Sequence, residues 1–304
     1  MSTPTISFEE GEAVLDWIGL TDALAAGHKL PKAEVADTFL YRAKDTLLTR
    51  SAWIDGLGVA IKAATIFPGN PAKGLGTVNG AMNLLSDKDG QLEAIIDFHL
   101  VTKWKTAADS LLGARRLARP DSETILIVGA GTVAASLREA YGALFPDARF
   151  RMWNRTIAKA EALAASYPNT EAVPDLRAAV EAADIITSAT SGTEPVIMGD
   201  WLRPGQHLDL IGAYRPDMRE ADDTALQRAK IFVDSRETTI GHIGEIEIPI
   251  QQGVITPADI HADFYTLDDF ARAPEDITLF KNGGGAHLDL MTASHILSAW
   301  TATK

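Results

Sequence analysis

The chain has 304 residues, 46% of them hydrophobic, which is typical of a soluble protein and long enough for two compact domains. Its 28 lysines and arginines stand against 41 aspartates and glutamates, and the resulting net charge of −13 opposes binding to nucleic acid or to an anionic membrane surface. The absence of cysteine excludes disulfides and thiolate chemistry. No apolar run approaches the roughly 18 residues of a membrane span, and Glu9, Glu10 and Glu12 stand where a secretion signal would be basic, so we expect a cytoplasmic protein.

The first hundred or so residues have the pattern of a small α+β domain. Apolar residues at helical spacing predict one helix or two short ones within residues 8–26. Strand-like segments follow with no helical segment between them, which indicates a mostly antiparallel sheet. The expected strands are residues 37–41, 46–53, 58–64, 77–85 and 92–98.

A long helix is expected over residues 100–118, and Pro120 ends it. The following segment, TILIVGAGTVAA, predicts a buried parallel strand over 124–128, a glycine turn and a helix over 133–144. Gly129 allows the tight turn and Gly131 the close approach of a pyrophosphate. The helix N-terminus, at Thr132 and Val133, would offer its free N–H groups to the phosphates.

The end of the next strand, residues 150–153, bears on which dinucleotide binds. NAD sites usually carry an Asp or Glu there for the ribose 2′-OH, whereas this chain has Asn154, Arg155 and Thr156. A guanidinium can hold a 2′-phosphate with paired hydrogen bonds, which a carboxylate would repel. The sequence therefore favours NADP(H), with NAD(H) as the alternative, and the other interpretation of Arg155 is a solvated surface residue.

The rest of the chain continues the alternation of helices (158–166, 176–181) and strands (185–189, 207–211, 231–234). Thr190 and Ser191 follow a strand of the sheet, where contact with the nucleotide is expected. Proline-containing loops are predicted near 199–204 and 214–216, and a last helix over 287–299 follows three glycines. The predicted fold is α/β, a Rossmann doubly wound parallel sheet over 119–287 with a smaller α+β substrate and dimerisation domain over 1–118, to which a C-terminal helix (288–304) returns.

Taken in order, several segments resemble the ornithine cyclodeaminase/mu-crystallin family. The matching segments are IKAATIFPGNPAKGLGTVNGAMNLLSDKDGQLEAIID, KWKTAADSLLGARRLA, VGAGTVAASL, MWNRT, IGAYRPDMREADD, VDSRE and LFKNGGGAHLDL. The resemblance implies a homodimer that pairs its substrate domains, a Rossmann domain carrying NAD(P)H, and chemistry on a small α-amino or α-imino acid. Activities in the family include ornithine cyclodeamination, alanine dehydrogenation and reduction of cyclic ketimines.

The resemblance also assigns site residues. Lys62 matches the family's active-site lysine, and Lys105 stands where the family usually has an arginine that grips the substrate carboxylate. Lysine in place of arginine keeps the positive charge but cannot bind a carboxylate through two parallel hydrogen bonds, as a guanidinium does. A second carboxylate-binding arginine matches either Arg42 or Arg50. Thr106, in the same segment as Lys105, is expected at the cofactor.

A further departure concerns the loop GAYRPDMRE. Cyclodeaminases and the related alanine dehydrogenases place an Asp two residues before its proline, where this chain has Tyr214. Without that carboxylate there is no evident general base for cyclodeamination, and the loop resembles the ketimine-reductase branch. We therefore expect an NADP-dependent oxidoreductase that reduces a small cyclic α-imino acid of the 1-pyrroline-2-carboxylate type. The alternatives are a cyclodeaminase-type lyase or amino-acid dehydrogenase, and a non-enzymatic NADP(H)-dependent ligand-binding protein.

Other chemistries find no support in the sequence. The seven histidines form no HExxH motif or close triplet, so no metal site is expected. Ser188 and Ser191 lack a nucleophile elbow, which argues against a hydrolase.

Overall fold

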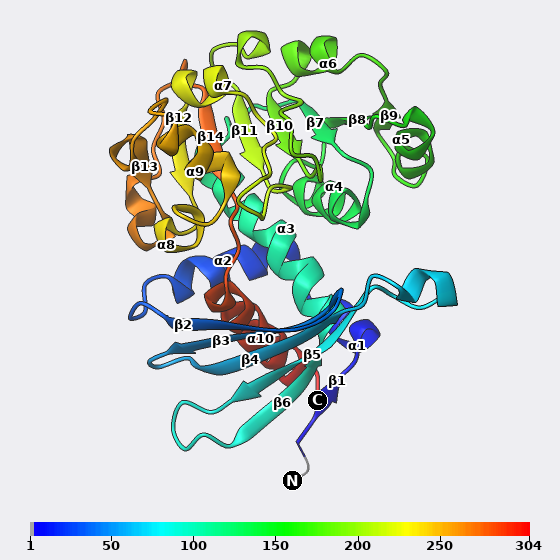
Figure 1. Ribbon diagram of the computed structural model, residues 1–304, viewed down its shortest axis with the longest axis vertical. Helices are drawn as coiled ribbons and strands as arrows, with labels where there is room; N and C mark the ends of the chain where they lie inside the picture. The colour runs from blue at the N-terminus through cyan, green and yellow to red at the C-terminus, as the bar shows by residue number, and fades with distance from the viewer. Residues whose placement is uncertain (1–2) are drawn as a thin grey trace. The chain divides into compact units, whose positions relative to one another are not determined.

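The computed structural model describes residues 3–304 (Figure 1). The chain divides into two compact units, one running to Lys105 and including Gly285–Lys304, the other spanning Thr106–Gly284. The first boundary lies inside helix α3 (Phe98–Leu117), whereas we expected it after residue 118. Early in α3, Trp104 stacks on Trp17 with ring centroids 3.9 Å apart, while the Thr106 carbonyl accepts a hydrogen bond from Asn282. The two ends of this helix therefore belong to different cores.

The first unit contains a six-stranded sheet in the order β1-β6-β5-β4-β3-β2. Strands β2 to β6 form an antiparallel meander, as predicted, and the short strand β1, which the sequence did not predict, pairs parallel to β6. The strands are β1 (Thr5–Ile6), β2 (Glu34–Arg42), β3 (Asp45–Ile54), β4 (Gly58–Ile66), β5 (Val78–Leu85) and β6 (Leu92–Asp97).

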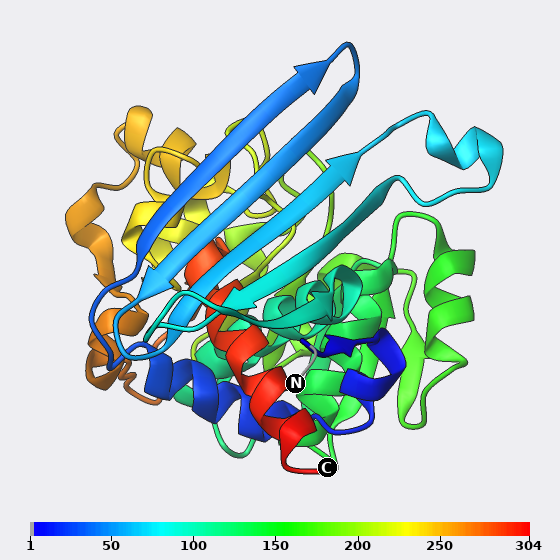
Figure 2. The same cartoon turned by 90° about the horizontal axis from the view of Figure 1, so that it is seen from below.

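Helices cover one face of this sheet. The N-terminal helical region forms two helices, α1 (Phe8–Glu12) and α2 (Trp17–Gly27). A 3₁₀ turn, η1 (Asn70–Lys73), lies between β4 and β5. Figure 2 shows α10 (Ala286–Thr301) lying across the sheet, with the far ends of β2 and β3 extending past it. Gly27 of α2 packs directly on Met291 of α10, because a Cβ there would lie 2.6 Å from the Met291 sulfur.

The second unit is built on eight parallel strands in the order β13-β12-β14-β11-β10-β7-β8-β9 (Figure 1). The order reverses between β7 and β10, which makes this the switch point of a doubly wound sheet. The strands are β7 (Thr124–Val128), β8 (Arg149–Trp153), β9 (Thr170–Ala172), β10 (Ile185–Ser188), β11 (His207–Leu210), β12 (Lys230–Val233), β13 (Ile260–Ala262) and β14 (Thr278–Lys281). The Rossmann prediction is confirmed, although β9, β13 and the central β14 were not predicted.

Helices and short 3₁₀ turns connect these strands. They are α4 (Thr132–Leu144), α5 (Ile157–Ala164), α6 (Leu176–Ala182), η2 (Gly199–Trp201), α7 (Asp223–Arg228), α8 (Arg236–Thr239), α9 (Gly244–Gln251), η3 (Pro257–Asp259) and η4 (Phe264–Asp269). The turn η2 lies where we expected an irregular loop, and α7 to α9 were not predicted. The core between strands and helices is apolar and fully buried at positions such as Leu126, Ile186 and Leu208.

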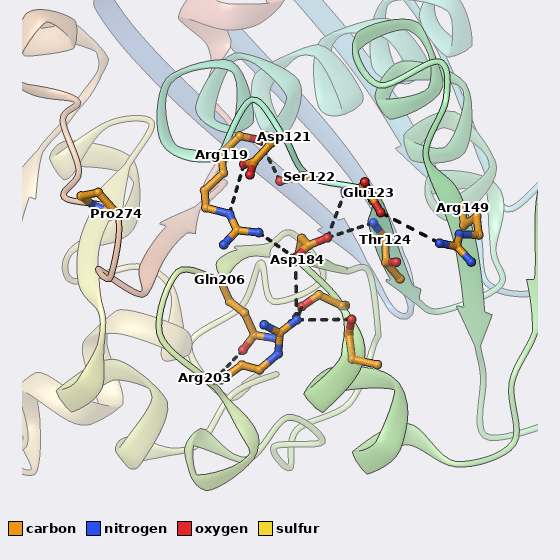
Figure 3. Close-up of polar contacts among 12 residues, drawn as sticks. Arg119, Asp121, Ser122, Glu123, Thr124, Arg149, Asp184, Arg203, Gln206 and Pro274 are labelled. Atoms are coloured by element: carbon orange, nitrogen blue, oxygen red, sulfur yellow. Dashed lines mark hydrogen bonds and ion pairs between the residues drawn. The ribbon is translucent and has the colours of Figure 1, made fainter.

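A polar network closes the amino edge of this sheet (Figure 3). The Asp184 carboxylate accepts hydrogen bonds from the backbone N–H groups of Glu123 (3.0 Å) and Thr124 (3.1 Å) and from the Arg119 guanidinium (3.0 Å). Arg203 adds a hydrogen bond to the Ala183 carbonyl at 2.9 Å. These contacts tie the starts of β7 and β10 together, which leaves the carboxyl edge as the place for a ligand. Within residues 3–304 no helix has the length and apolar character needed to cross a bilayer.

Candidate functional site

The glycine turn after β7 has the geometry of a pyrophosphate site. Gly129 has φ 126°, and a Cβ on it would lie 2.8 Å from the Ala189 carbonyl oxygen, so only glycine fits. Gly131 is the N-cap of α4, and a Cβ on it would meet no atom within 4 Å. No side chain in the described part of the chain caps α4, and Thr132 and Val133 are exposed. The open space and the uncapped helix N-terminus fit the phosphates of a dinucleotide.

The residues after β8 lie at the same edge of the sheet. Asn154 turns its side chain back onto the Thr156 carbonyl with a hydrogen bond of 2.9 Å. Arg155 is exposed, and among residues 3–304 its guanidinium has no hydrogen bond or ion pair. A free cation and no carboxylate therefore follow this strand.

The loops after β10 and β11 carry three more of the predicted residues. Thr190 donates both its N–H (2.7 Å) and its hydroxyl (2.8 Å) to Glu220, a residue that the sequence analysis did not single out. Ser191 is exposed. Tyr214 is 66% exposed, with the Arg215 guanidinium 5.6 Å from its ring centre. Thr106 lies on α3, where its carbonyl accepts a hydrogen bond from the Asn282 side chain, and the Asn282 backbone N–H donates to the Leu210 carbonyl at the end of β11.

Lys62 lies in a buried polar cluster of the first unit. The strand register places it directly opposite Arg50, and Arg50 opposite Asp37. The Lys62 Nζ donates to Asp289 Oδ1 of α10 at 2.7 Å, and the two side chains are 8% and 1% exposed. Burial lowers the pKa of Lys62, the Asp289 charge opposes that shift, and the charge of Lys105 adds to it.

The structure separates the two candidate arginines. Arg50 grips Asp37 through Nε and Nη2 at 2.8–3.1 Å and lies next to Lys62 across the sheet. Arg42 lies at the far end of the β2–β3 hairpin, where it pairs with Asp45 and its side chain is 79% exposed. Arg50 therefore joins the Lys62 cluster and Arg42 does not.

Lys105 and His287 complete the cluster. Lys105 is only 7% exposed, and no acidic side chain of the described residues forms an ion pair with it. His287, at the start of α10, packs edge-on against His28 with ring centres 5.4 Å apart. Burial lowers the pKa of His287 well below its usual range, with His28 and Lys105 adding to the shift, so the ring is neutral at pH 7.

The charges of the cluster do not cancel. Asp37 pairs with Arg50 and Asp289 pairs with Lys62, whereas no acidic side chain of residues 3–304 forms an ion pair with Lys105. A cluster of this kind suits a small carboxylate ligand. Residues 3–304 contain no group of three or more His, Asp or Glu arranged to hold a metal ion.

The second unit, with its open glycine turn, defines the protein as a Rossmann-type dinucleotide-binding protein. The sequence model of the ornithine cyclodeaminase/mu-crystallin family matches residues 52–304. The chain belongs to this family.

Individual relatives match over nearly the whole chain. The Δ1-pyrroline-2-carboxylate reductase of Paracoccus denitrificans is 52% identical over 300 residues, covering 96% of this chain and 95% of the relative. The structure of the Thermococcus litoralis Δ1-pyrroline-2-carboxylate reductase with NADH and L-proline has 26% identity and a TM-score of 0.90, over 99% of this chain and 98% of the other. An archaeal alanine dehydrogenase dimer with bound NAD has 27% identity and a TM-score of 0.90, over 100% and 97%.

Proposed function

We propose that the protein is an NAD(P)H-dependent reductase that converts a small cyclic α-imino acid, of the 1-pyrroline-2-carboxylate type, into the corresponding amino acid. The observation that carries the proposal is Lys105, which is 7% exposed, has no acidic ion-pair partner among residues 3–304 and lies in the same cluster as Lys62 and Arg50. The similarity to Δ1-pyrroline-2-carboxylate reductases supports the same substrate class.

The cluster supplies binding and orientation. Lys105, which has no acidic ion-pair partner among residues 3–304, is the group best placed to receive the substrate carboxylate, and Arg50 and Lys62 reinforce the positive field. Asp289 holds Lys62 in place and keeps its charge compensated. When bound, the nicotinamide would supply a hydride to the C=N carbon, with the π electrons of that bond going to the nitrogen, which would take up a proton. Rate enhancement by these side chains is then mainly positioning.

We further propose that NADP(H) is the preferred cofactor. Arg155 is an exposed guanidinium with no ion pair in the described chain, and residues 154–156 contain no carboxylate to repel a 2′-phosphate. NAD(H) remains the alternative, and the archaeal structures with the same fold were obtained with NADH and NAD.

The decisive experiment compares three reactions of the purified protein. We expect NADPH oxidation with 1-pyrroline-2-carboxylate and no NAD-dependent ammonia release from ornithine, because Tyr214 replaces the carboxylate base of the cyclodeaminases. Ammonia release at a rate comparable with imine reduction would assign the protein to the lyases. Tight binding of a small carboxylate without turnover of either substrate would make it a ligand-binding protein.

Lys62→Met and Arg42→Met test the role of the cluster. The first should lower kcat/KM for the imine by about a hundredfold, since it removes one of the positive charges that favour binding of the substrate carboxylate. Arg42→Met removes an equal charge from an exposed position and should leave kcat/KM unchanged. Equal effects of the two substitutions would remove Lys62 from the proposed site.

We also propose a homodimer formed through the first unit. Strand β2 is a nine-residue edge strand, exposed along its whole length, and it carries Val35 (45% exposed), Phe39 (47%), Leu40 (61%) and Tyr41 (73%). Such an edge favours pairing with another strand. Light scattering at micromolar concentration should give twice the chain mass, and Leu40→Glu should weaken the dimer whereas Ile157→Glu, at an exposed site on α5, should not. A monomeric wild type would contradict this proposal.

The location of the protein stays a prediction. We propose the cytoplasm, which fractionation of the source cells would test.

A further inference from the structure

A single buried carboxylate joins the two loops that follow β10 and β11. Glu220 Oε1 accepts hydrogen bonds from the Ser188 hydroxyl (2.6 Å) and from the N–H and hydroxyl of Thr190 (2.7 and 2.8 Å). Its Oε2 accepts from the backbone N–H groups of Gly212 (2.5 Å) and Ala213 (3.3 Å). The side chain is completely buried, so these donors replace water for the carboxylate.

The loop after β10 and the loop after β11 pack backbone against backbone at Thr190 and Gly212. A Cβ on Gly212 would lie 1.9 Å from the Thr190 carbonyl oxygen and 2.6 Å from the Glu220 carboxylate. The residue before Thr190 is approached in the same way by the glycine turn after β7, since a Cβ on Gly129 would lie 2.8 Å from the Ala189 carbonyl oxygen. The loops after β7, β10 and β11 therefore form one continuous ledge across the switch point of the sheet.

Two further buried groups hold Glu220 itself. Glu245 accepts hydrogen bonds from the backbone N–H of Glu220 (2.7 Å) and Ala221 (3.1 Å), which fixes the backbone that carries the carboxylate. Lys281 donates to the Leu210 and Asn282 carbonyls at 2.8 and 2.6 Å, and its charge opposes the rise in the pKa of Glu220 that burial causes. Glu245 thus fixes the backbone of Glu220, and the charge of Lys281 favours the ionised form of its carboxylate.

We propose that Glu220 is a positioning residue for the dinucleotide: it sets the loop after β10 against the loop after β11 and so shapes the ledge on which the nicotinamide half of the cofactor rests. The inference rests on the proposed dinucleotide site, since the crevice at a switch point is where parallel sheets bind such ligands. Glu220 is not itself a catalytic residue, because both of its oxygens are occupied by the two loops. It acts through Thr190 and through the backbone that leads to Tyr214.

The test is Glu220→Gln, compared with Glu194→Gln at an exposed position of the loop after β10. A glutamine keeps the shape of the side chain but replaces one carboxylate oxygen with an NH₂ group. The N–H groups of Thr190 or of Gly212 and Ala213 then face a donor in place of an acceptor, so the hydrogen bonds to one of the two loops are lost. We expect the Kd for NADPH to rise and kcat to fall, each by about tenfold or more, with the KM for the imine changed less than about threefold. Glu194→Gln should match the wild type in all three. A folded Glu220→Gln protein with wild-type Kd and kcat would overturn the inference.

A second measurement needs no variant. Hydrogen exchange of the wild type with and without NADPH should show residues 189–193 and 212–219 gaining protection together, because one carboxylate couples them. Protection of one loop alone, or of neither, would overturn the inference even if Glu220→Gln failed to fold. A wild type that binds NADPH but does not reduce the imine would refute the proposed reaction and leave this test intact.

Discussion

The buried pair of Lys62 and Asp289 permits a quantitative prediction. At 2.7 Å and an effective dielectric constant of about 20, the Coulomb attraction is about 6 kcal/mol, and the desolvation of two nearly inaccessible groups offsets much of it. Removing one partner leaves the other buried and uncompensated. We therefore expect Asp289→Asn and Lys62→Met each to lower the free energy of unfolding by about 3–5 kcal/mol.

A double-mutant cycle measures the coupling directly. The double variant removes both charges at once and leaves neither uncompensated. Its free energy of unfolding should therefore fall by at least about 2 kcal/mol less than the sum of the falls in the two single variants. Urea denaturation followed by tryptophan fluorescence gives the values, since Trp17 and Trp104 stack within the same unit. The exposed pair of Arg42 and Asp45 is the control, and Asp45→Asn should cost less than about 1 kcal/mol. Additive losses at positions 62 and 289 would refute the reasoning.

The same pair predicts a dependence on pH. Because burial lowers the pKa of Lys62, the unfolded chain binds a proton that the folded chain releases between the lowered pKa and the ordinary value of 10.5. Stability from this group is therefore smallest below the lowered pKa and rises with pH across that window. Lys62→Met should remove this rise, whereas Asp289→Asn should extend it to lower pH, because Asp289 opposes the shift.

Three shorter predictions concern the second unit. Arg155→Ala should weaken NADPH binding by about 1.5–3 kcal/mol and leave NADH binding unchanged, and equal NADPH affinity by calorimetry would remove Arg155 from the cofactor site. Gly129→Ala should abolish dinucleotide binding because its Cβ meets the Ala189 carbonyl, whereas Gly90→Ala, also at positive φ but with no neighbour, should bind normally. Burial raises the pKa of Glu245 from 4.5 to about 7, so stability should fall as pH rises through that interval, and a Glu245→Gln slope as steep as the wild type's would contradict this.

Much of the fold could be predicted because its segments carry simple patterns. Strands β2 to β8 follow alternating or continuous apolar runs, and the turn at Gly129 combines a strand, glycines and a helix in a diagnostic order. Strand β14 was missed because Lys281 ends its short run TLFK, and a lysine in a central strand looks like a loop residue until its buried carbonyl partners are known.

The candidate site was predictable in part. Alternation along a strand does not say which arginine faces Lys62. That depends on the β3–β4 turn, where Gly56 has φ 84°, and on the register that this turn fixes, which places Arg50 opposite Lys62. Asp289 is 227 residues from Lys62 along the chain, so no local pattern could pair them. Glu220 was missed for the same reason, because its partners come from two other loops.

The placement of α10 has a consequence for biosynthesis. The first unit is assembled from segments on either side of the second unit, and the helix that carries Asp289 is translated only after Gly284. The second unit is continuous in sequence and can fold while the polypeptide is still growing. During that interval the sheet that carries Lys62 lacks both the cover of α10 and the counter-charge of Asp289. During synthesis the second unit can therefore finish folding before the first unit, which needs the C-terminal helix. The strands of the first unit are the segment that most needs protection from aggregation in that interval.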